Sequence, residues 1–284
     1  ETIRMSFTVD TNSVPDKEIE AGKQNFDSWL LTSAGRYYWE REACAIDEHL
    51  KCLPGPHVLS LGTGLSAGKA AALATNRDFP YLYVASSHER SYSSNKDNIK
   101  KVENHRICSV VLESLPFETD SMSSVLAIHS LEMCVRPDQA LREIKRVLQP
   151  EGYVLFSGFN TISPNYWGIS TWALRGSRYP NTIWHPRLSD WLRLLEFEVV
   201  ASSMFAYAPG FIASRMPGVS EAIESAGDRW WPLLGSGYVL VARKTVLGRK
   251  LVGGRLTSLL AHGNVVLGSS STSSNRQTRK TSDN

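Results

Sequence analysis

The segment at residues 56–66, PHVLSLGTGLS, constrains the fold of this chain more than any other. Its largely apolar run VLSL is typical of a buried strand in a parallel sheet. Gly62 and Gly64 follow at once, and without a Cβ atom they let the backbone turn tightly and approach a ligand closely. The segment therefore predicts a strand that leads directly into a nucleotide-binding loop.

The rest of the chain alternates between apolar runs of strand length and amphipathic stretches with helical spacing. Residues 26–50 carry apolar side chains at near-helical spacing and predict a helical lid before the first strand. Strands separated by helices specify an α/β fold: a Rossmann-like, doubly wound, mostly parallel sheet with helices on both faces. Further strands are predicted at 81–85, 107–112, 125–129, 153–157, 197–202 and 238–243, and helices at 67–74, 138–148 and 188–195.

Three parts are predicted along the chain: an N-terminal extension with the lid at 1–55, the Rossmann-like domain at 56–244, and a basic tail at 245–284. From residue 242 onward there are eight basic residues and one acidic residue. Such a tail can touch phosphates, but its end lacks apolar side chains, which favours a solvated, disordered extension. A nucleic-acid partner has no other support in the sequence and is not favoured.

Cysteine spacing and hydropathy exclude several classes of protein. Cys44, Cys52, Cys108 and Cys134 form no CxxC pair, so we expect reduced thiols and no metal site. No apolar stretch reaches the roughly 20 residues of a membrane span, and the first residues have no signal-peptide core. The sequence predicts a soluble, cytoplasmic protein and makes no prediction of its oligomeric state.

In a doubly wound sheet the ligand lies at the carboxyl ends of the strands, near the point where the strand order reverses. The residues at or just after the ends of the first four predicted strands are 62–66, 86–89, 111–114 and 129–132. These four segments are therefore expected to line one crevice.

Two further blocks carry a family resemblance. After VLSLGTGLS come LESLPFETDSMSSVLAIHSLEM and ALREIKRVLQPEGYVLFSGFN. In this order they resemble the class I S-adenosylmethionine-dependent methyltransferases, particularly the branch of ubiquinone and menaquinone biosynthesis. The resemblance is strongest over 115–156, and the flanks extend it to about 26–244, where they are similar to a less characterised bacterial subgroup.

The resemblance implies S-adenosylmethionine as cofactor, with its methionine part against the glycine turn, where free backbone N–H groups are available. It also implies transfer of the methyl group to a small-molecule acceptor. The implied cofactor-binding residues are Ser60, Gly62, Thr63, Gly64, Ser86, Ser87, Leu112, Glu113 and His129.

Several positions that are acidic in the family pattern are neutral in this chain. They are Ser60, Ser86 or Ser87, Val111 or Leu112, and Ser123. Replacing a charge-assisted hydrogen bond by a neutral one weakens binding by about tenfold. Glu89 or Glu113, slightly out of register, could supply part of the loss. The alternative to the enzyme is therefore a methyltransferase-like binding or regulatory protein without catalysis.

The glycine turn also fits a dinucleotide-binding motif, because Gly62, Gly64 and Ala67 match an allowed variant of G-x-G-x-x-G. That motif needs an acidic residue about 20 positions later to bind the ribose. Ser86 and Ser87 stand there instead. The blocks downstream also favour the methyltransferase over an NAD-binding protein.

Methyl transfer requires an aligned acceptor and, for some acceptors, a base. The best candidate for a base is His129, at the end of the fourth predicted strand; the alternative is that it only hydrogen-bonds the loop. Residues 159–187 are rich in aromatic side chains and predict a lid that stacks on a flat or apolar acceptor. Trp230 and Trp231 are predicted to lie in the core.

Overall fold

The computed structural model of this chain describes residues 16–75, 79–86, 106–166 and 182–245. Contacts divide the chain into two units, Glu1–Leu247 and Gly248–Asn284, and every described residue belongs to the first. The predicted tail lies outside the described residues except for Thr245. The predicted boundary between the extension and the Rossmann-like domain stays a prediction.

One seven-stranded sheet with the order β3-β2-β1-β4-β5-β7-β6 forms the centre of the fold. Strands β1 to β5 run parallel to one another, and β7 runs antiparallel to both of its neighbours. The strand order reverses between β1 and β4. This confirms the Rossmann-like, mostly parallel sheet. The strands are β1 (His57–Gly62), β2 (Tyr81–Ser86), β3 (Arg106–Ser109), β4 (Met122–Ile128), β5 (Leu148–Phe159), β6 (Phe197–Phe205) and β7 (Gly237–Lys244).

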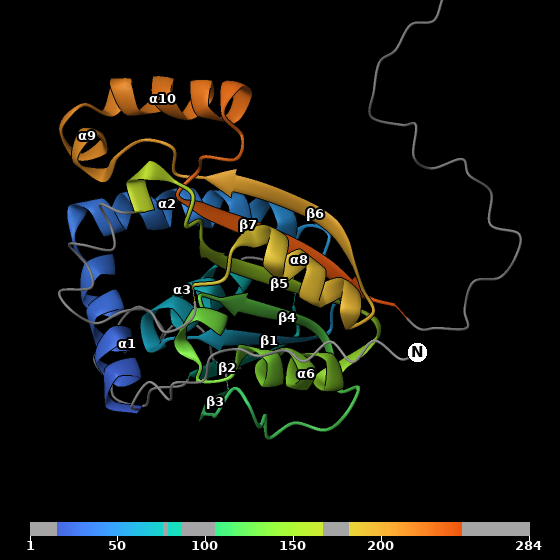
Figure 1. Ribbon diagram of the computed structural model, residues 1–284. Coiled ribbons are helices and arrows are strands. Elements are labelled where there is room, and N and C mark those ends of the chain that lie inside the picture. Colours follow the sequence, from blue (N-terminus) through green and yellow to red (C-terminus); the bar gives the residue numbers. More distant parts are fainter. Residues whose placement is uncertain (1–15, 76–78, 87–105, 167–181, 246–284) are drawn as a thin grey trace, which may run out of the picture. The chain divides into compact units, whose positions relative to one another are not determined.

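Helices cover both faces of the sheet, with α6 and α8 in front of it and α2 and α3 behind it in Figure 1. Successive side chains of a strand point to opposite faces. In β1, Val58 joins the core with α2 and α3, whereas Leu59 and Leu61 join the core with α6 and α8. The helices are α1 (Asp16–Leu30), α2 (Ser33–Leu50), α3 (Gly64–Thr75), α6 (Pro137–Val147), α8 (His185–Leu194), α9 (Gly210–Arg215) and α10 (Pro217–Trp230), with a short 3-10 helix, η1 (Leu131–Met133).

Residues 26–50, predicted to form a helical lid, belong to two helices, the end of α1 and the whole of α2. The chain turns after Leu30, and the Thr32 hydroxyl caps α2 by accepting a hydrogen bond from the N–H of Gly35 at 3.1 Å. A Cβ atom at Gly35 would lie 2.1 Å from the carbonyl oxygen of Trp29, so only glycine permits this tight turn. Apolar periodicity continues across the turn, which is why the sequence pattern did not reveal it.

Helix α1 stands beside the carboxyl ends of the parallel strands (Figure 1). It contacts α3 and η1, which follow β1 and β4 directly. Phe26 and Leu30 of α1 are fully buried in the core shared with α2 and α3. The edge at which a ligand is expected is therefore covered by an N-terminal helix.

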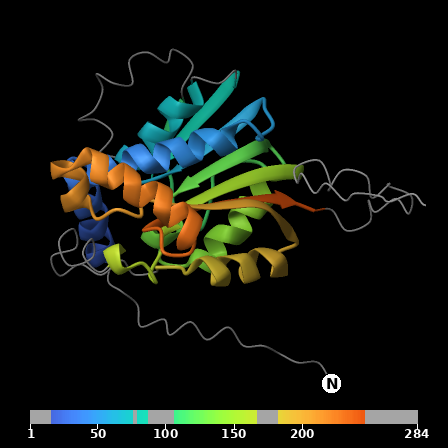
Figure 2. The same cartoon turned by 90° about the horizontal axis from the view of Figure 1, so that it is seen from above.

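Helices α9 and α10 were not predicted from the sequence. They lie above the sheet in Figure 1, and Figure 2 shows the same helices from above. Helix α9 packs against both α2 and α10. The prediction that Trp230 and Trp231 are core residues is wrong, because their side chains are 70% and 56% exposed. The reason is that α10 lies on the surface and buries only Ser220 and Gly227.

Of two other predicted segments, one differs from the structure and one lies partly outside the described residues. Strand β3 ends at Ser109, and the predicted strand at 107–112 is wrong beyond that residue because the chain turns back there in a bridge between Val111 and Ser114. Of the predicted aromatic lid at 159–187, residues 167–181 lie outside the described part, so the lid stays a prediction. Among the described helices, none combines the length and the apolar composition needed to cross a bilayer.

Candidate functional site

The glycine turn joins β1 to α3 at the point where the strand order reverses. A Cβ atom at Gly62 would lie 2.6 Å from Ser66 Oγ and 2.8 Å from the carbonyl oxygen of Ile128, at the end of β4. Glycine is therefore required by the close packing of the turn against β4. Gly64 is the first residue of α3, so the turn presents the N-terminus of a twelve-residue helix, which favours anionic groups.

An acidic side chain lies on this turn, and it comes from α1. The hydroxyl of Thr63 donates a hydrogen bond to Asp27 Oδ1 at 2.8 Å, and Ser66 Oγ lies 2.9 Å from the same hydroxyl. Asp27 is 8% exposed, and Thr63 is fully buried. The turn therefore carries a carboxylate that the strand sequence lacks.

Two of the neutral positions have internal roles. Ser60 is fully buried and donates its hydroxyl to the carbonyl oxygen of Ala67 at 3.0 Å. Ser123 is the second residue of β4, far along the strand from the carboxyl end, and its hydroxyl accepts the N–H of His57 at 3.4 Å. A carboxylate at Ser123 would stand at the wrong end of the strand, so its absence does not bear on the crevice.

The residues predicted around the ribose and the adenine are brought together only in part. Ser86 is buried at the end of β2, and its carbonyl oxygen accepts the N–H of Val110 at 3.0 Å. Leu112 is buried in the core next to α6. Ser87, like Glu89, lies outside the described residues. Glu113 is used elsewhere, because its carboxylate accepts the N–H groups of Val135 and Arg136 at 2.8 and 3.0 Å.

His129 follows β4 directly and lies between two carboxylates. Its Nδ1 is 2.7 Å from Glu132 Oε2, and its Nε2 is 3.2 Å from Glu42 Oε1. Glu132, in η1, also accepts the N–H of Phe159 at 2.6 Å, and Glu42, in α2, accepts the hydroxyl of Ser157. All three charged side chains are buried. The sequence placed Glu132 in the segment 129–132, which was expected to line the crevice, but gave it no role, and it gave no sign of Glu42.

Aromatic rings enclose this cluster of Glu42, His129 and Glu132. The His129 ring centroid is 4.4 Å from that of Phe159, 4.8 Å from Phe26 and 5.9 Å from Tyr38. Burial alone would lower the pKa of His129, but the two carboxylates outweigh it and raise that pKa to about 10. The imidazole is therefore protonated at neutral pH.

A protonated imidazole cannot accept a proton, so this arrangement does not favour the role of base predicted for His129. It favours a positioning role, because the ring ties η1, β5 and α2 together at the end of β4. His129 also has a φ of 50°, an uncommon conformation for a residue with a side chain. Catalysis by His129 stays a prediction.

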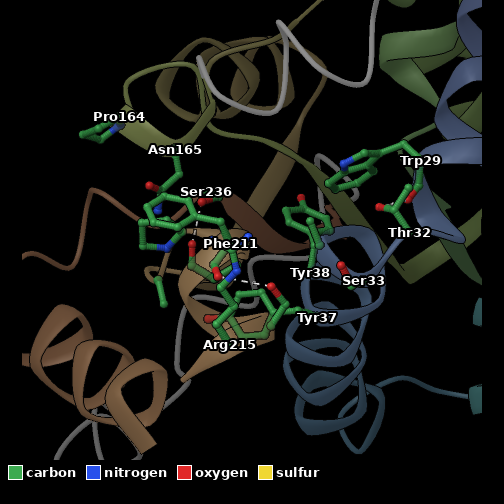
Figure 3. Close-up of a pocket in the computed structure, with 16 residues that line it drawn as sticks. Trp29, Thr32, Ser33, Tyr37, Tyr38, Pro164, Asn165, Phe211, Arg215 and Ser236 are labelled. Atoms are coloured by element: carbon green, nitrogen blue, oxygen red, sulfur yellow. Dashed lines mark hydrogen bonds between the residues drawn. The ribbon is translucent and has the colours of Figure 1, made fainter. Parts of the chain in front are cut away.

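A cavity of about 560 Å³ lies next to the aromatic residues around His129. In Figure 3 the side chains from α1 and α2, including Trp29 and Tyr38, face those of the segments after β5 and β6. Trp29 and Tyr38 also contact Phe159, at 6.0 and 5.2 Å between ring centroids. The cavity is lined by Trp29, Thr32, Ser33, Ala34, Tyr37, Tyr38, Pro164, Asn165, Ala206, Ala208, Pro209, Gly210, Phe211, Ser214, Arg215 and Ser236.

The described residues include no group of three or more His, Cys, Asp or Glu side chains arranged to hold a metal ion. The groups that the described residues bring to the strand ends are the N-terminus of α3, carboxylates, hydroxyls, the His129 imidazole and aromatic rings.

Comparisons with known proteins agree with this geometry. Residues 59–156 match the family model of the methyltransferase domain. The uncharacterized protein YafS of Escherichia coli (strain K12) is 37% identical over 99 residues, which are 34% of this chain and 40% of that protein. The demethylmenaquinone methyltransferase of Mycobacterium marinum is 27% identical over 148 residues, 50% of this chain and 56% of the relative. The matches thus span from two fifths to just over half of these relatives.

The fold is shared with solved methyltransferases. An S-adenosylmethionine-dependent methyltransferase of Thermotoga maritima superposes with a TM-score of 0.56 and 15% sequence identity, covering 81% of this chain and 99% of that structure. At this identity the similarity shows the fold and leaves the chemistry to the residues of this chain.

Proposed function

We propose that this chain, which carries a methyltransferase domain on the class I fold, binds S-adenosylmethionine and transfers its methyl group to a small molecule. The observation that carries the proposal is the carboxylate of Asp27 on the glycine turn. It supplies an acidic group at the place where the turn's own sequence has lost one.

The residues of the turn fit the amino-acid end of the cofactor. That end carries an ammonium group and a carboxylate. Asp27 would hold the ammonium, and the N-terminus of α3, which begins at Gly64, would hold the carboxylate. Gly62 keeps the turn close to β4, so both groups act on one small region.

The cofactor supplies a methyl group that its sulfonium has already activated. A bond forms between the acceptor atom and the methyl carbon, the carbon–sulfur bond breaks, and its electron pair stays on sulfur. The task left to the protein is to align the acceptor and exclude water. Phe26 and Phe159 would provide an apolar wall for this purpose, held in place by the ion pair of His129 and Glu132. A proton lost by the acceptor would pass to water, because His129 is already protonated.

A second function, cofactor or ligand binding without catalysis, is favoured by the closure of the site. His129 is fully buried, and the described end of β2 offers Ser86 and no carboxylate for the ribose. A protein of this kind would bind the cofactor, or another ligand of the same crevice, as a signal.

Calorimetric titration with S-adenosylhomocysteine tests the proposal on the full chain. Binding at micromolar to submillimolar concentration supports it, and 5′-methylthioadenosine, which lacks the ammonium and the carboxylate, should then bind more weakly. No heat of binding at millimolar S-adenosylhomocysteine would refute the proposal. Product formation with a library of small acceptors would separate the enzyme from the non-catalytic alternative.

We also infer that the protein works in a reducing compartment, the cytoplasm. Cys44, Cys52 and Cys134 are free thiols, two of them exposed, which supports this location.

A further inference from the structure

The cavity next to Trp29 has a wall in common with the crevice at the strand ends. Trp29 and Tyr38 line the cavity, and both rings pack against Phe159, which contacts His129 at the end of β4. On the same helix, Asp27 reaches the glycine turn. Helix α1 therefore contributes one residue to each of two adjoining sites.

The volume and the walls of this cavity suit a small organic molecule. About 560 Å³ lies within the roughly 300–1,000 Å³ of small-molecule sites. Aromatic rings reach the cavity from two helices: Tyr37 and Tyr38 come from α2, and Phe211 comes from α9 (Figure 3). Aromatic walls of this kind favour a flat ligand, because rings stack or meet edge to face.

The lining of the cavity holds one charged side chain, and the carboxylate of Glu224 contacts two of the lining residues, Tyr37 and Ala208, from outside it. Of the lining residues, only Arg215 carries a full charge, and no carboxylate in the described part of the chain forms an ion pair with it. The nearby Glu224 is engaged by the Tyr37 hydroxyl and by the N–H of Ala208. Burial, reinforced by Glu224, raises the pKa of Tyr37, so its hydroxyl stays neutral at neutral pH.

We propose that this cavity binds the methyl acceptor, and that the acceptor is a flat aromatic molecule bearing an anionic oxygen group that Arg215 holds. The proposal rests on the proposed methyltransferase function and adds to it the place and the chemical class of the acceptor. Arg215 anchors the anion on the α9 side, and the opposite end of the molecule then points toward Trp29 and Tyr38, which border the crevice. Arg215 is a binding residue in this arrangement and takes no part in the transfer.

The test is calorimetry on the full chain with two probes of the same shape, 2-naphthoate and its neutral counterpart 2-naphthamide. A charge-assisted hydrogen bond adds about tenfold in affinity, so naphthoate should bind about ten times more tightly. Arg215→Gln should remove that preference and leave the affinity for naphthamide unchanged. Arg229→Gln, an arginine of α10 that does not line the cavity, should keep the preference. Ser214→Trp, which fills the cavity from an exposed position, should weaken both probes.

Equal affinity for the two probes, or a preference that survives Arg215→Gln, overturns the proposed class of acceptor. Failure of both probes to bind at millimolar concentration overturns the cavity as a binding site, even if S-adenosylhomocysteine binds. If naphthoate binds through Arg215 but S-adenosylhomocysteine does not, the assignment as an acceptor site is overturned together with the proposed function.

Discussion

The cluster of Glu42, His129 and Glu132 should make the stability of this protein fall as the pH rises above neutrality. The pKa of His129 is raised from 6.5 to about 10 in the folded protein. A raised pKa means that the folded state binds the proton more tightly than the unfolded state. The stabilising contribution is therefore complete below pH 6.5 and is lost as the pH rises toward 10.

The size of this effect follows from the interval between the two pKa values. Within it, the free energy of unfolding falls by about 1.4 kcal/mol per pH unit for one proton. Across the whole interval the loss is on the order of 5 kcal/mol. A domain has a total stability of only about 5–15 kcal/mol. The effect should therefore be large enough to measure by urea denaturation at pH 6.5, 7.5, 8.5 and 9.5.

The matched comparison is His129→Gln against His49→Gln. His129→Gln removes the titrating group, so its stability should vary less with pH than that of the unaltered protein between 6.5 and 9.5. Burial lowers the pKa of His49, so its pH dependence lies below 6.5 and His49→Gln should keep the slope. Tyr238, also near Glu132, does not titrate in this range because burial raises its pKa well above 10.

Two results would refute the reasoning. One is parallel pH profiles of the unaltered protein and His129→Gln. The other, independent of whether the variant folds, is an NMR titration with labelled histidine in which the His129 ring is neutral at pH 8. In the second case the ring could again be considered as a base.

Three further changes test the turn and the surface. In calorimetry, Asp27→Asn should weaken the binding of S-adenosylhomocysteine by about tenfold and leave the binding of 5′-methylthioadenosine unaffected. The control Asp190→Asn, on the exposed face of α8, should change the binding of neither ligand. If Asp27→Asn weakens both ligands equally, the role of Asp27 is merely structural. Gly62→Ala places a Cβ atom 2.8 Å from the carbonyl oxygen of Ile128 in β4 and should lower the free energy of unfolding, measured by thermal denaturation, by about 1–3 kcal/mol. The control Gly218→Ala, whose Cβ would have no atom within 4 Å, should not destabilise the protein. Trp230→Ser should stay within about 0.5 kcal/mol of the unaltered stability, and a larger loss would contradict its exposed position.

Much of the sheet could be predicted because its signals are local. Strands β1, β2, β4, β5, β6 and β7 and helices α3, α6 and α8 were all expected near their observed positions. Burial on both faces of a parallel strand requires a continuous apolar run, and a helix packed by one face requires a period of about 3.6 residues. The glycine turn was found for the same reason, since its tight packing demands a residue without a Cβ.

The sequence indicated candidate site residues only at the ends of strands, because a strand end is recognisable from its neighbouring residues. Gly62 and Thr63 lie at the end of β1 and His129 at the end of β4, as expected, whereas Asp27 and Glu42 reach this edge of the sheet from α1 and α2. Thr63 and Asp27 are 36 positions apart, and no local pattern connects them. Ser60 shows the opposite case: it occupies an acidic position of the family pattern, yet its hydroxyl is used inside the turn.

By itself the sequence determined most strands of the mostly parallel sheet, the helices α3, α6 and α8 between them, and the place of the glycine turn, because each depends on neighbouring residues. Only the tertiary structure decided which acidic groups face that turn, the charge state of His129, and the cavity between α2 and α9. Those properties depend on burial and on charges brought together from distant segments. The strand ends lack the acidic residues of the family pattern, but α1, which precedes them in the chain, places the carboxylate of Asp27 on the glycine turn.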